Sequence, residues 1–270
     1  MKWIVDFHTH AFPDELSKRV IKMLEEEGGV RAQLDGTISS LLTSMDACGI
    51  EKSVICNIST NLSQFHSILT WCKKIRSERI IPFPSFHPYD GEFRDRIETI
   101  RREGFLGIKF HPYYQNFSID EARVLPVYEK ISEENLILVM HTGFDFAFPF
   151  VRIADPEKIL RIAEWFPSLK LVTTHLGAWK QWEEVERYIV GKPIYMEISY
   201  ALDFLNESPA VRNIFSTHPT EYILFGTDSP WTHQHETLSL LRELNLGEEK
   251  EKLILRENAL SLLNSVSGSS

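Results

Sequence analysis

Eight short hydrophobic runs recur along the chain, and turn residues bound each of them. The runs cover residues 3–7, 52–58, 80–86, 105–110, 136–140, 169–173, 194–198 and 222–225. Hydrophobic runs without polar alternation are typical of strands in a parallel sheet that is buried on both faces. We therefore predict eight parallel strands.

The segments between these runs carry the spacing and end signals of helices. Apolar side chains before Gly49 recur at steps of three and four residues, and glycine is typical just after a helix ends. Asp155 and Pro156 are typical of a helix start. The last helix is predicted over residues 248–263, and the serine-rich residues 265–270 are predicted to form a disordered tail.

Strands that alternate with helices over this length predict one α/β domain, a (β/α)8 TIM barrel over residues 1–264. A doubly wound open sheet is the alternative. No Gly-x-Gly-x-x-Gly or phosphate-binding loop follows any predicted strand, which favours the barrel.

The composition narrows the classes of partner. The formal net charge is −9, and no basic cluster occurs, so we expect no nucleic-acid or anionic-membrane partner. No run reaches the roughly 18 apolar residues of a membrane span, and we expect no signal peptide at the N-terminus. Cys48, Cys56 and Cys72 lack the spacing of a zinc-thiolate site and suit a reducing compartment. We expect a cytoplasmic enzyme with a small-molecule substrate. The enzyme can be a monomer or a homo-oligomer.

Titratable residues stand at the ends of five predicted strands. They are His8 and His10, Lys109 and His111, His141, His175, and Asp228. In a (β/α)8 barrel the carboxyl ends of the strands carry the active site, so these side chains are expected at one rim.

His8 and His10 lie two residues apart, so on a strand they point the same way and can bind one ion. Imidazoles with one carboxylate and an open position make a catalytic divalent site, most often for zinc. The ion lowers the pKa of its water, and a carboxylate beside it can carry the proton to a leaving group.

The chain resembles the amidohydrolase superfamily, and within it the amidohydrolase-related branch that includes proteins similar to aminocarboxymuconate semialdehyde decarboxylase. The matching segments are residues 6–10 (DFHTH), 107–112 (GIKFHP), 141–143 (HTG), 174–177 (THLG), 225–230 (FGTDSP) and 257–259 (ENA). They span nearly the whole chain in the family's order.

The resemblance implies a role for each matching residue. His8, His10 and His141 would bind the ion, and Asp228 would be both a ligand and the proton shuttle. His175 would polarise the water or the substrate carbonyl, or bind a second ion. Lys109 would be carboxylated and bridge two ions, or would bind substrate beside a single ion; we expect one Zn²⁺ in preference to two.

Other residues are candidates for contact with substrate. His111 follows Lys109 at the next same-face position, although a structural role before Pro112 fits equally well. Trp231 is a candidate pocket wall, as is Trp179, and Arg152 a candidate carboxylate clamp. The aromatic residues 144–150 predict a lid or pocket wall over the site, or a dimer contact.

These observations predict a metal-dependent hydrolase that acts on the amide, ester or lactone carbonyl of a small molecule, which can carry a carboxylate. A decarboxylase of an aromatic or muconate-like acid is the alternative. A TatD-like nuclease is less favoured, because Lys109 stands where that group would bring a metal-binding glutamate. A histidinol-phosphatase type of barrel is also disfavoured, because it would need further ligand histidines soon after His10 and directly after Asp228. The non-enzymatic alternative is a barrel that binds metal only for stability.

Overall fold

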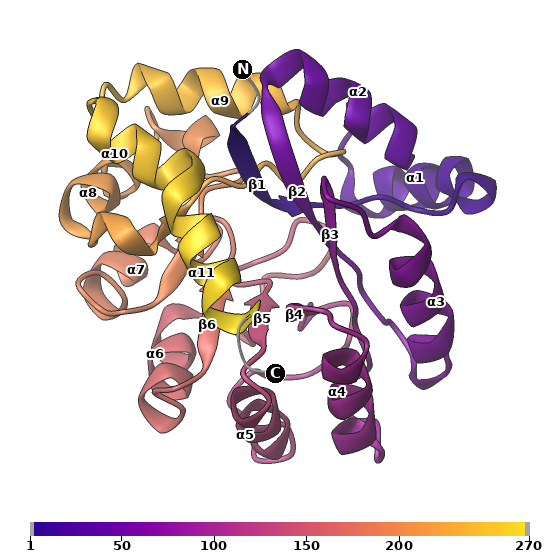
Figure 1. Ribbon diagram of the computed structural model, residues 1–270. Helices are drawn as coiled ribbons and strands as arrows, with labels where there is room; N and C mark the ends of the chain where they lie inside the picture. Colours follow the sequence, from indigo (N-terminus) through magenta and orange to yellow (C-terminus); the bar gives the residue numbers. More distant parts are fainter. Residues whose placement is uncertain (1–2, 268–270) are drawn as a thin grey trace.

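The computed structural model describes residues 3–267 and has eight parallel strands with helices around them (Figure 1). The strands are β1 Ile4–Thr9, β2 Ile50–Cys56, β3 Ile80–Phe83, β4 Gly107–Phe110, β5 Ile137–Met140, β6 Lys170–Thr173, β7 Tyr195–Glu197 and β8 Ile223–Leu224. All eight predicted strands are therefore confirmed, in the order that a (β/α)8 barrel requires.

The strands pair in two parallel sheets, β1-β2-β3 and β4-β5-β6-β7-β8. Individual hydrogen bonds connect the two sheets on both sides. The Lys109 amide donates to the Pro84 carbonyl over 3.0 Å, and the Phe7 amide donates to the Phe225 carbonyl over 2.8 Å. A parallel bridge joins Thr9 to Ser229. The strands thus surround a common interior, with irregular backbone at the two connections between the sheets.

The helices follow the strands in alternation. They are α1 Asp14–Gly28, α2 Ile38–Cys48, α3 Phe65–Ile75, α4 Phe93–Arg102, α5 Leu125–Glu133, α6 Pro156–Trp165, α7 Trp182–Tyr188, α8 Pro209–Thr217, α9 Gln234–Glu243, α10 Glu248–Lys252 and α11 Asn258–Ser267. Gly49 ends α2 with a φ of 71°, as predicted. Asp155 precedes α6 as predicted, but its side chain makes no capping hydrogen bond.

Four short helical segments complete the connections. They are η1 Leu62–Gln64, η2 Leu202–Phe204, η3 Thr220–Tyr222 and the π-helical turn η4 Leu253–Glu257. The π turn interrupts the final helical stretch between α10 and α11, which the sequence pattern predicts as one helix.

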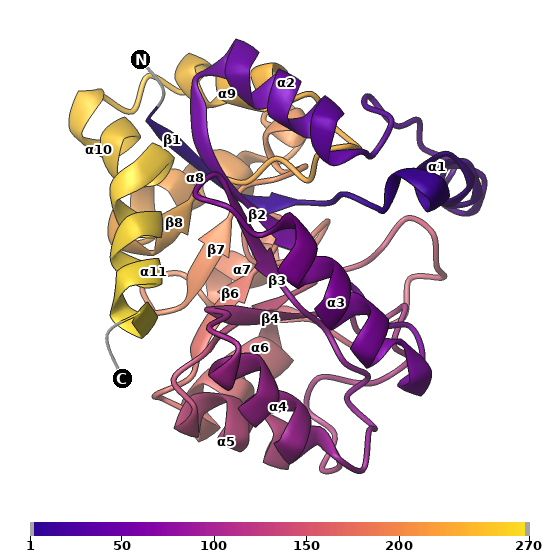
Figure 2. The same ribbon diagram turned by 45° about the vertical axis from the view of Figure 1, so that its right-hand side comes forward.

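The interior of the barrel is a separate apolar cluster, in which inward residues of the strands pack against α11. Phe7 and Val139 belong to it, together with Leu262 and Val266 of α11. Figure 2 has α11 and α1 on opposite sides of the strands. Because Val266 is fully buried in this cluster, α11 continues to Ser267. The predicted disordered tail is therefore wrong for residues 265–267, and residues 268–270 lie outside the described part.

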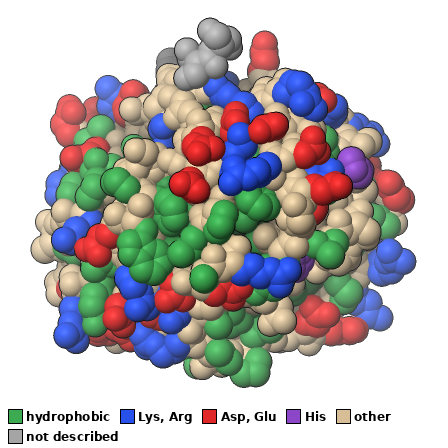
Figure 3. Space-filling view, turned by 90° about the horizontal axis from the view of Figure 1, so that it is seen from below, with side chains coloured by type: hydrophobic (Ala, Val, Ile, Leu, Met, Phe, Trp, Pro, Cys, Tyr) green, Lys and Arg blue, Asp and Glu red, His purple; other side chains and the backbone are tan. Residues whose placement is uncertain are grey.

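The charged side chains are dispersed over the surface that Figure 3 shows. Lysines and arginines alternate there with acidic and hydrophobic side chains, without a large patch of one sign. Within residues 3–267, no helix combines the length and the apolar character needed to cross a bilayer.

Candidate metal centre

The backbone of β1 pairs with the loop after β8, and this pairing brings together side chains from the two ends of the chain. The His8 carbonyl accepts from the Asp228 amide over 2.7 Å, and the His10 amide donates to the Ser229 carbonyl over 2.6 Å. The buried Asp6 carboxylate adds two bonds of 2.7 Å, from the Thr227 hydroxyl and the Gln234 amide. These bonds fix the loop that carries Asp228 against β1.

A local irregularity turns His8 toward the interior. Phe7 already packs in the interior cluster, so strict alternation would point His8 to the opposite face. The register between β1 and β2 shifts between Asp6 and Thr9. As a result, His8 and His10 both line one cavity, as their spacing predicts.

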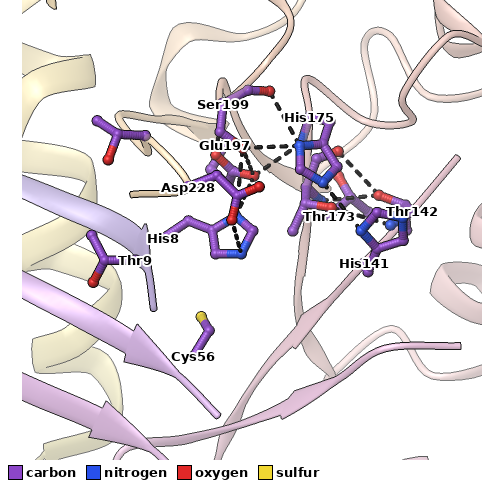
Figure 4. Close-up of polar contacts among 12 residues, drawn as sticks. His8, Thr9, Cys56, His141, Thr142, Thr173, His175, Glu197, Ser199 and Asp228 are labelled. Carbon is purple, nitrogen blue, oxygen red and sulfur yellow. Dashed lines mark hydrogen bonds and ion pairs between the residues drawn. The ribbon is translucent and has the colours of Figure 1, made fainter. Parts of the chain in front are cut away.

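His8, His10 and Asp228 form a compact group of possible ligands. Nε2 of His8 lies 3.1 Å from Nε2 of His10, and these two nitrogens lie 3.4 and 3.0 Å from Oδ1 of Asp228. Figure 4 has the Asp228 carboxylate directed at the His8 ring. All three ligand atoms would reach one ion with small adjustments.

The partners of the other ring nitrogens determine which nitrogens carry protons. Nδ1 of His10 lies 2.7 Å from the Cys56 carbonyl, and Nδ1 of His8 lies 3.0 Å from the Glu197 carboxylate. Both partners can only accept, so each Nδ1 carries the proton and each Nε2 presents a lone pair. Two lone pairs and a carboxylate oxygen therefore face one another, which is the donor set of a divalent cation.

Asp228 is the acidic member of this group. Its buried Oδ1 has no hydrogen-bond partner among the described residues. A buried carboxylate oxygen without a proton donor fits metal ligation, because orphan polar atoms are rare in protein interiors.

Glu197, which the sequence analysis missed, holds this group in place. It is fully buried at the end of β7, and its carboxylate accepts from the His175 amide over 2.9 Å and from the Ser199 hydroxyl over 2.8 Å, besides its contact with His8. Gly226 leaves the space for it, since a Cβ there would lie 2.3 Å from Oε2 of Glu197. The available signal was an acidic residue inside an apolar strand, two positions before Ser199.

His141 and His175 form a second group beside the first. His141 Nε2 lies 3.1 Å from the Phe144 carbonyl, and His175 Nδ1 lies 3.2 Å from the Ser199 carbonyl. Each of these nitrogens therefore donates, which leaves His141 Nδ1 and His175 Nε2 facing each other as acceptors at 3.1 Å. His141 is thus close to His175 and is not part of the compact group of His8, His10 and Asp228.

The backbone is strained where two of these side chains are presented. His175 and Asp228 have φ of 57° and 59°, the left-handed region that non-glycine residues rarely adopt. Each such residue costs of the order of 1 kcal/mol and persists where the surrounding structure enforces it. Both turns direct a predicted site residue toward the interior from the end of its strand.

Lys109 extends from β4 into the same interior. Its side chain is buried, and Nζ lies 3.2 Å from Nε2 of His8. The Lys109 charge adds to burial in lowering the pKa of His8 well below its ordinary value. The ring therefore stays neutral, which is the form that binds metal.

His111 lies beside His141 but contacts it through its ring face instead of through a ring nitrogen. Its ring stacks on His141 with centroids 4.0 Å apart and planes 13° apart, and Nε2 lies 3.3 Å from the Asp145 carboxylate. His111, His141 and Asp145 are a second group of possible metal ligands. Because the near-parallel rings hold their lone pairs in separate parallel planes, this group fits a hydrogen-bonded arrangement better than a common ion. The aromatic loop thereby contributes Asp145 to the wall of the site.

A cavity of about 570 Å³ opens onto all these groups. The lining includes Trp231 and Phe146, which fits the pocket wall predicted for them, and His111, a predicted substrate contact. Trp179 instead lines a neighbouring cavity of about 300 Å³.

The structure corrects the prediction for Arg152. Its guanidinium is exposed and bound by both Glu184 oxygens, at 2.8 and 2.5 Å, away from the cavity lining. The predicted carboxylate clamp is wrong because the loop turns Arg152 toward α7.

Comparisons with known proteins agree with this geometry. A family model described as amidohydrolase matches residues 5–264. An uncharacterised TIM-barrel protein from Bordetella bronchiseptica has a similar structure, with a TM-score of 0.77, 19% identity, and coverage of 97% of this chain and 99% of that chain.

Two further solved structures belong to enzymes. A 2,6-dihydroxybenzoate decarboxylase has a TM-score of 0.70, 14% identity, and coverage of 98% and 100% of the two chains. A probable 2-pyrone-4,6-dicarboxylic acid hydrolase from Acinetobacter baumannii has a TM-score of 0.67, 13% identity, and coverage of 98% and 100%. At these identities the likeness establishes the fold alone. No curated protein matches the sequence significantly.

Proposed function

The chain belongs to the amidohydrolase family, and we propose that it is a metal-dependent hydrolase that adds water to the carbonyl carbon of an amide, ester or lactone. The convergence of His8 Nε2, His10 Nε2 and Asp228 Oδ1, with the ring protons placed on the two Nδ1 atoms, carries this proposal. We propose one Zn²⁺ ion at this group, with His141 and His175 as the position for a second.

The ion would supply Lewis-acid polarisation and a water of lowered pKa. The protein residues have complementary tasks. Asp228, ionised and 3.0 Å from His10, can take a proton from the attacking water and return it to the leaving group. The Lys109 ammonium can hold the substrate oxygen on which negative charge develops. Nε2 of His175 can accept a hydrogen bond from the attacking water. Glu197 keeps His8 in the correct tautomer throughout.

Decarboxylation of an aromatic acid is the second candidate. The buried Lys109 ammonium could hold a carboxylate beside the same metal group. However, Lys109 is the sole lysine or arginine among the described residues that line the cavity. A second cationic group would be expected if the site held both a reacting carboxylate and a second acidic substituent, so the lining disfavours diacids. For an acid with one carboxylate, product analysis distinguishes decarboxylation from the hydrolysis proposed first.

Product analysis tests the assignment. Protein dialysed against EDTA and reloaded with Zn²⁺ is incubated in H₂¹⁸O with 4-nitrophenyl esters, aryl lactones and N-acyl amides, and separately with 2,6-dihydroxybenzoate. We expect zinc-dependent turnover of a carbonyl substrate with one ¹⁸O incorporated in the acid product. Release of carbon dioxide from the benzoate, without ¹⁸O incorporation from any carbonyl substrate, would assign the decarboxylase instead.

A further inference from the structure

Helix α1 presents most of its apolar side chains to the cavity. It contains five apolar residues, and four of them, Leu16, Val20, Met23 and Leu24, line the cavity, whereas Ile21 is buried on another face. The four recur at steps of four, three and one residues, so they form one stripe along the helix. The four side chains of the stripe form part of the cavity wall and do not belong to the hydrophobic core.

This stripe is partly open to solvent. Leu16 is 37% exposed and Met23 is 47% exposed, which places them among the most exposed large hydrophobic residues of the described chain. Across the cavity, Ile68 and Trp71 of α3 supply further apolar surface. Figure 2 has α1 and α3 on the same side of the barrel. A mainly apolar channel, with Thr60, Gln64 and Ser67 as polar lining residues, thus leads from the surface to His8 and His10.

Charge is distributed unevenly along this channel. Asp228 and Lys109 lie at the inner end, while Glu27 is the charged lining residue that α1 contributes. A volume of about 570 Å³ falls within the range of roughly 300–1,000 Å³ for pockets that hold drug-sized ligands. A compact polyanionic acid would leave the apolar outer part empty and would meet Glu27 instead of a cation.

We infer that the substrate carries a neutral, extended apolar group, an alkyl or arylalkyl chain, which lies between α1 and α3 while its carbonyl end reaches the metal centre. The position of the carbonyl end rests on the proposed function. The apolar stripe carries the inference about the chain, together with the absence of lysine and arginine from the outer lining within residues 3–267.

A series of ligands that need not react tests this inference. Calorimetry measures the binding of butanoate, hexanoate, octanoate and decanoate to the zinc-loaded protein. The dissociation constant should fall by about fourfold for each methylene that enters the channel. An affinity that does not depend on chain length would overturn the inference.

Two variants establish where the chain binds. Met23→Glu adds a negative charge on the stripe and should weaken octanoate binding by about tenfold or more, because the chain would then contact a charged group. Lys22→Gln changes the net charge equally, but Lys22 is exposed and does not line the cavity, so its affinity should match the wild type. Trp71→Ala removes apolar surface from the opposite wall and should also weaken binding.

The outcomes separate this inference from the proposed function. Equal octanoate affinity in the wild type and in Met23→Glu would overturn the inference, even if esters are hydrolysed. Chain-length-dependent binding that both wall variants weaken would support it, even if no hydrolysis occurs and the proposed function fails.

Discussion

Glu197 Oε1 lies 3.0 Å from Nδ1 of His8, and this contact leaves the Nε2 lone pair of His8 facing His10 and Asp228. Glu197 also accepts from the His175 amide, so one buried carboxylate joins the first strand to the turn after the sixth. Carboxylates behind ligand histidines orient the ring and raise its basicity. We therefore expect the proposed metal centre to depend on Glu197, which is not among its proposed ligands.

Replacing Glu197 tests this dependence. Glu197→Gln keeps the shape but removes the negative charge behind His8, and metal affinity should fall by about 10- to 100-fold. Competition with a zinc-binding chelator measures the affinity. Glu207→Gln is the control, because Glu207 is exposed on the loop before α8. Unchanged zinc affinity in Glu197→Gln would mean that Glu197 does not support the ligand.

Gly226 offers a backbone test of the same contact. In Gly226→Ala the new Cβ would meet Oε2 of Glu197 at 2.3 Å, so Glu197 must move. Overpacking of this kind typically lowers the free energy of unfolding by about 1–3 kcal/mol. Denaturant unfolding with and without zinc measures the loss, which should be larger for the zinc-loaded protein.

Gly91→Ala is the matched control for Gly226→Ala. A Cβ at Gly91 meets no atom within 4 Å, so its free energy of unfolding should be near that of the wild type. Equal stability of the two glycine variants, with and without zinc, would contradict the packing described for Glu197.

Asp228→Asn removes the proposed proton shuttle while preserving size. Turnover of whichever ester or lactone is hydrolysed should fall below about a tenth of the wild-type kcat/KM, because the amide cannot take the proton. Circular dichroism should show an unchanged fold. The exposed Asp203→Asn is the control. If a folded Asp228→Asn protein kept more than about a tenth of the wild-type kcat/KM, Asp228 would not be the proton shuttle.

The metal-free protein should lose stability on acidification. Burial lowers the pKa of His8, His111 and His141 well below the ordinary 6.5. Below pH 6.5 these three histidines take up protons in the unfolded chain but not in the folded chain, so their contribution to stability is full above 6.5 and falls as the pH decreases. Burial raises the pKa of Asp6 to about 7, which opposes this fall with one proton against three, so the net stability still decreases. Melting in EDTA between about pH 7.5 and 5.5 measures this fall.

A histidine on the surface provides the control for this pH dependence. His66→Gln should leave the decrease in melting temperature unchanged, because His66 is exposed on α3. A melting temperature of the metal-free wild type that is constant, or rises, toward pH 5.5 would contradict the burial of these rings as neutral histidines.

Much of the fold was predictable because local signals coincide with the global arrangement. Apolar runs mark the strands, Gly49 marks the end of α2, and strand order follows from alternation with helices. The residues at strand ends, His8, His10 and Asp228, were therefore predictable as neighbours. The end of α11 was not, because the burial of Val266 depends on the barrel interior.

The remaining parts of the site depend on non-local geometry. Glu197 is an acidic exception inside an apolar strand, and only the structure shows that Gly226, in the loop after β8, leaves room for it. Arg152 pairs with Glu184 because of a loop path that no periodicity encodes. The apolar stripe of α1 is regular in the sequence, but its direction toward the cavity is set by tertiary packing.

Zinc stoichiometry tests the central claim most directly. Protein freed of metal with EDTA, reloaded with Zn²⁺ and desalted is analysed for zinc by elemental analysis, for the wild type and for the His8→Ala, His10→Ala double variant. We expect about one zinc per chain in the wild type and nearly none in a folded double variant, since two of three clustered ligands are lost. Full zinc occupancy in the double variant would contradict the proposed metal centre.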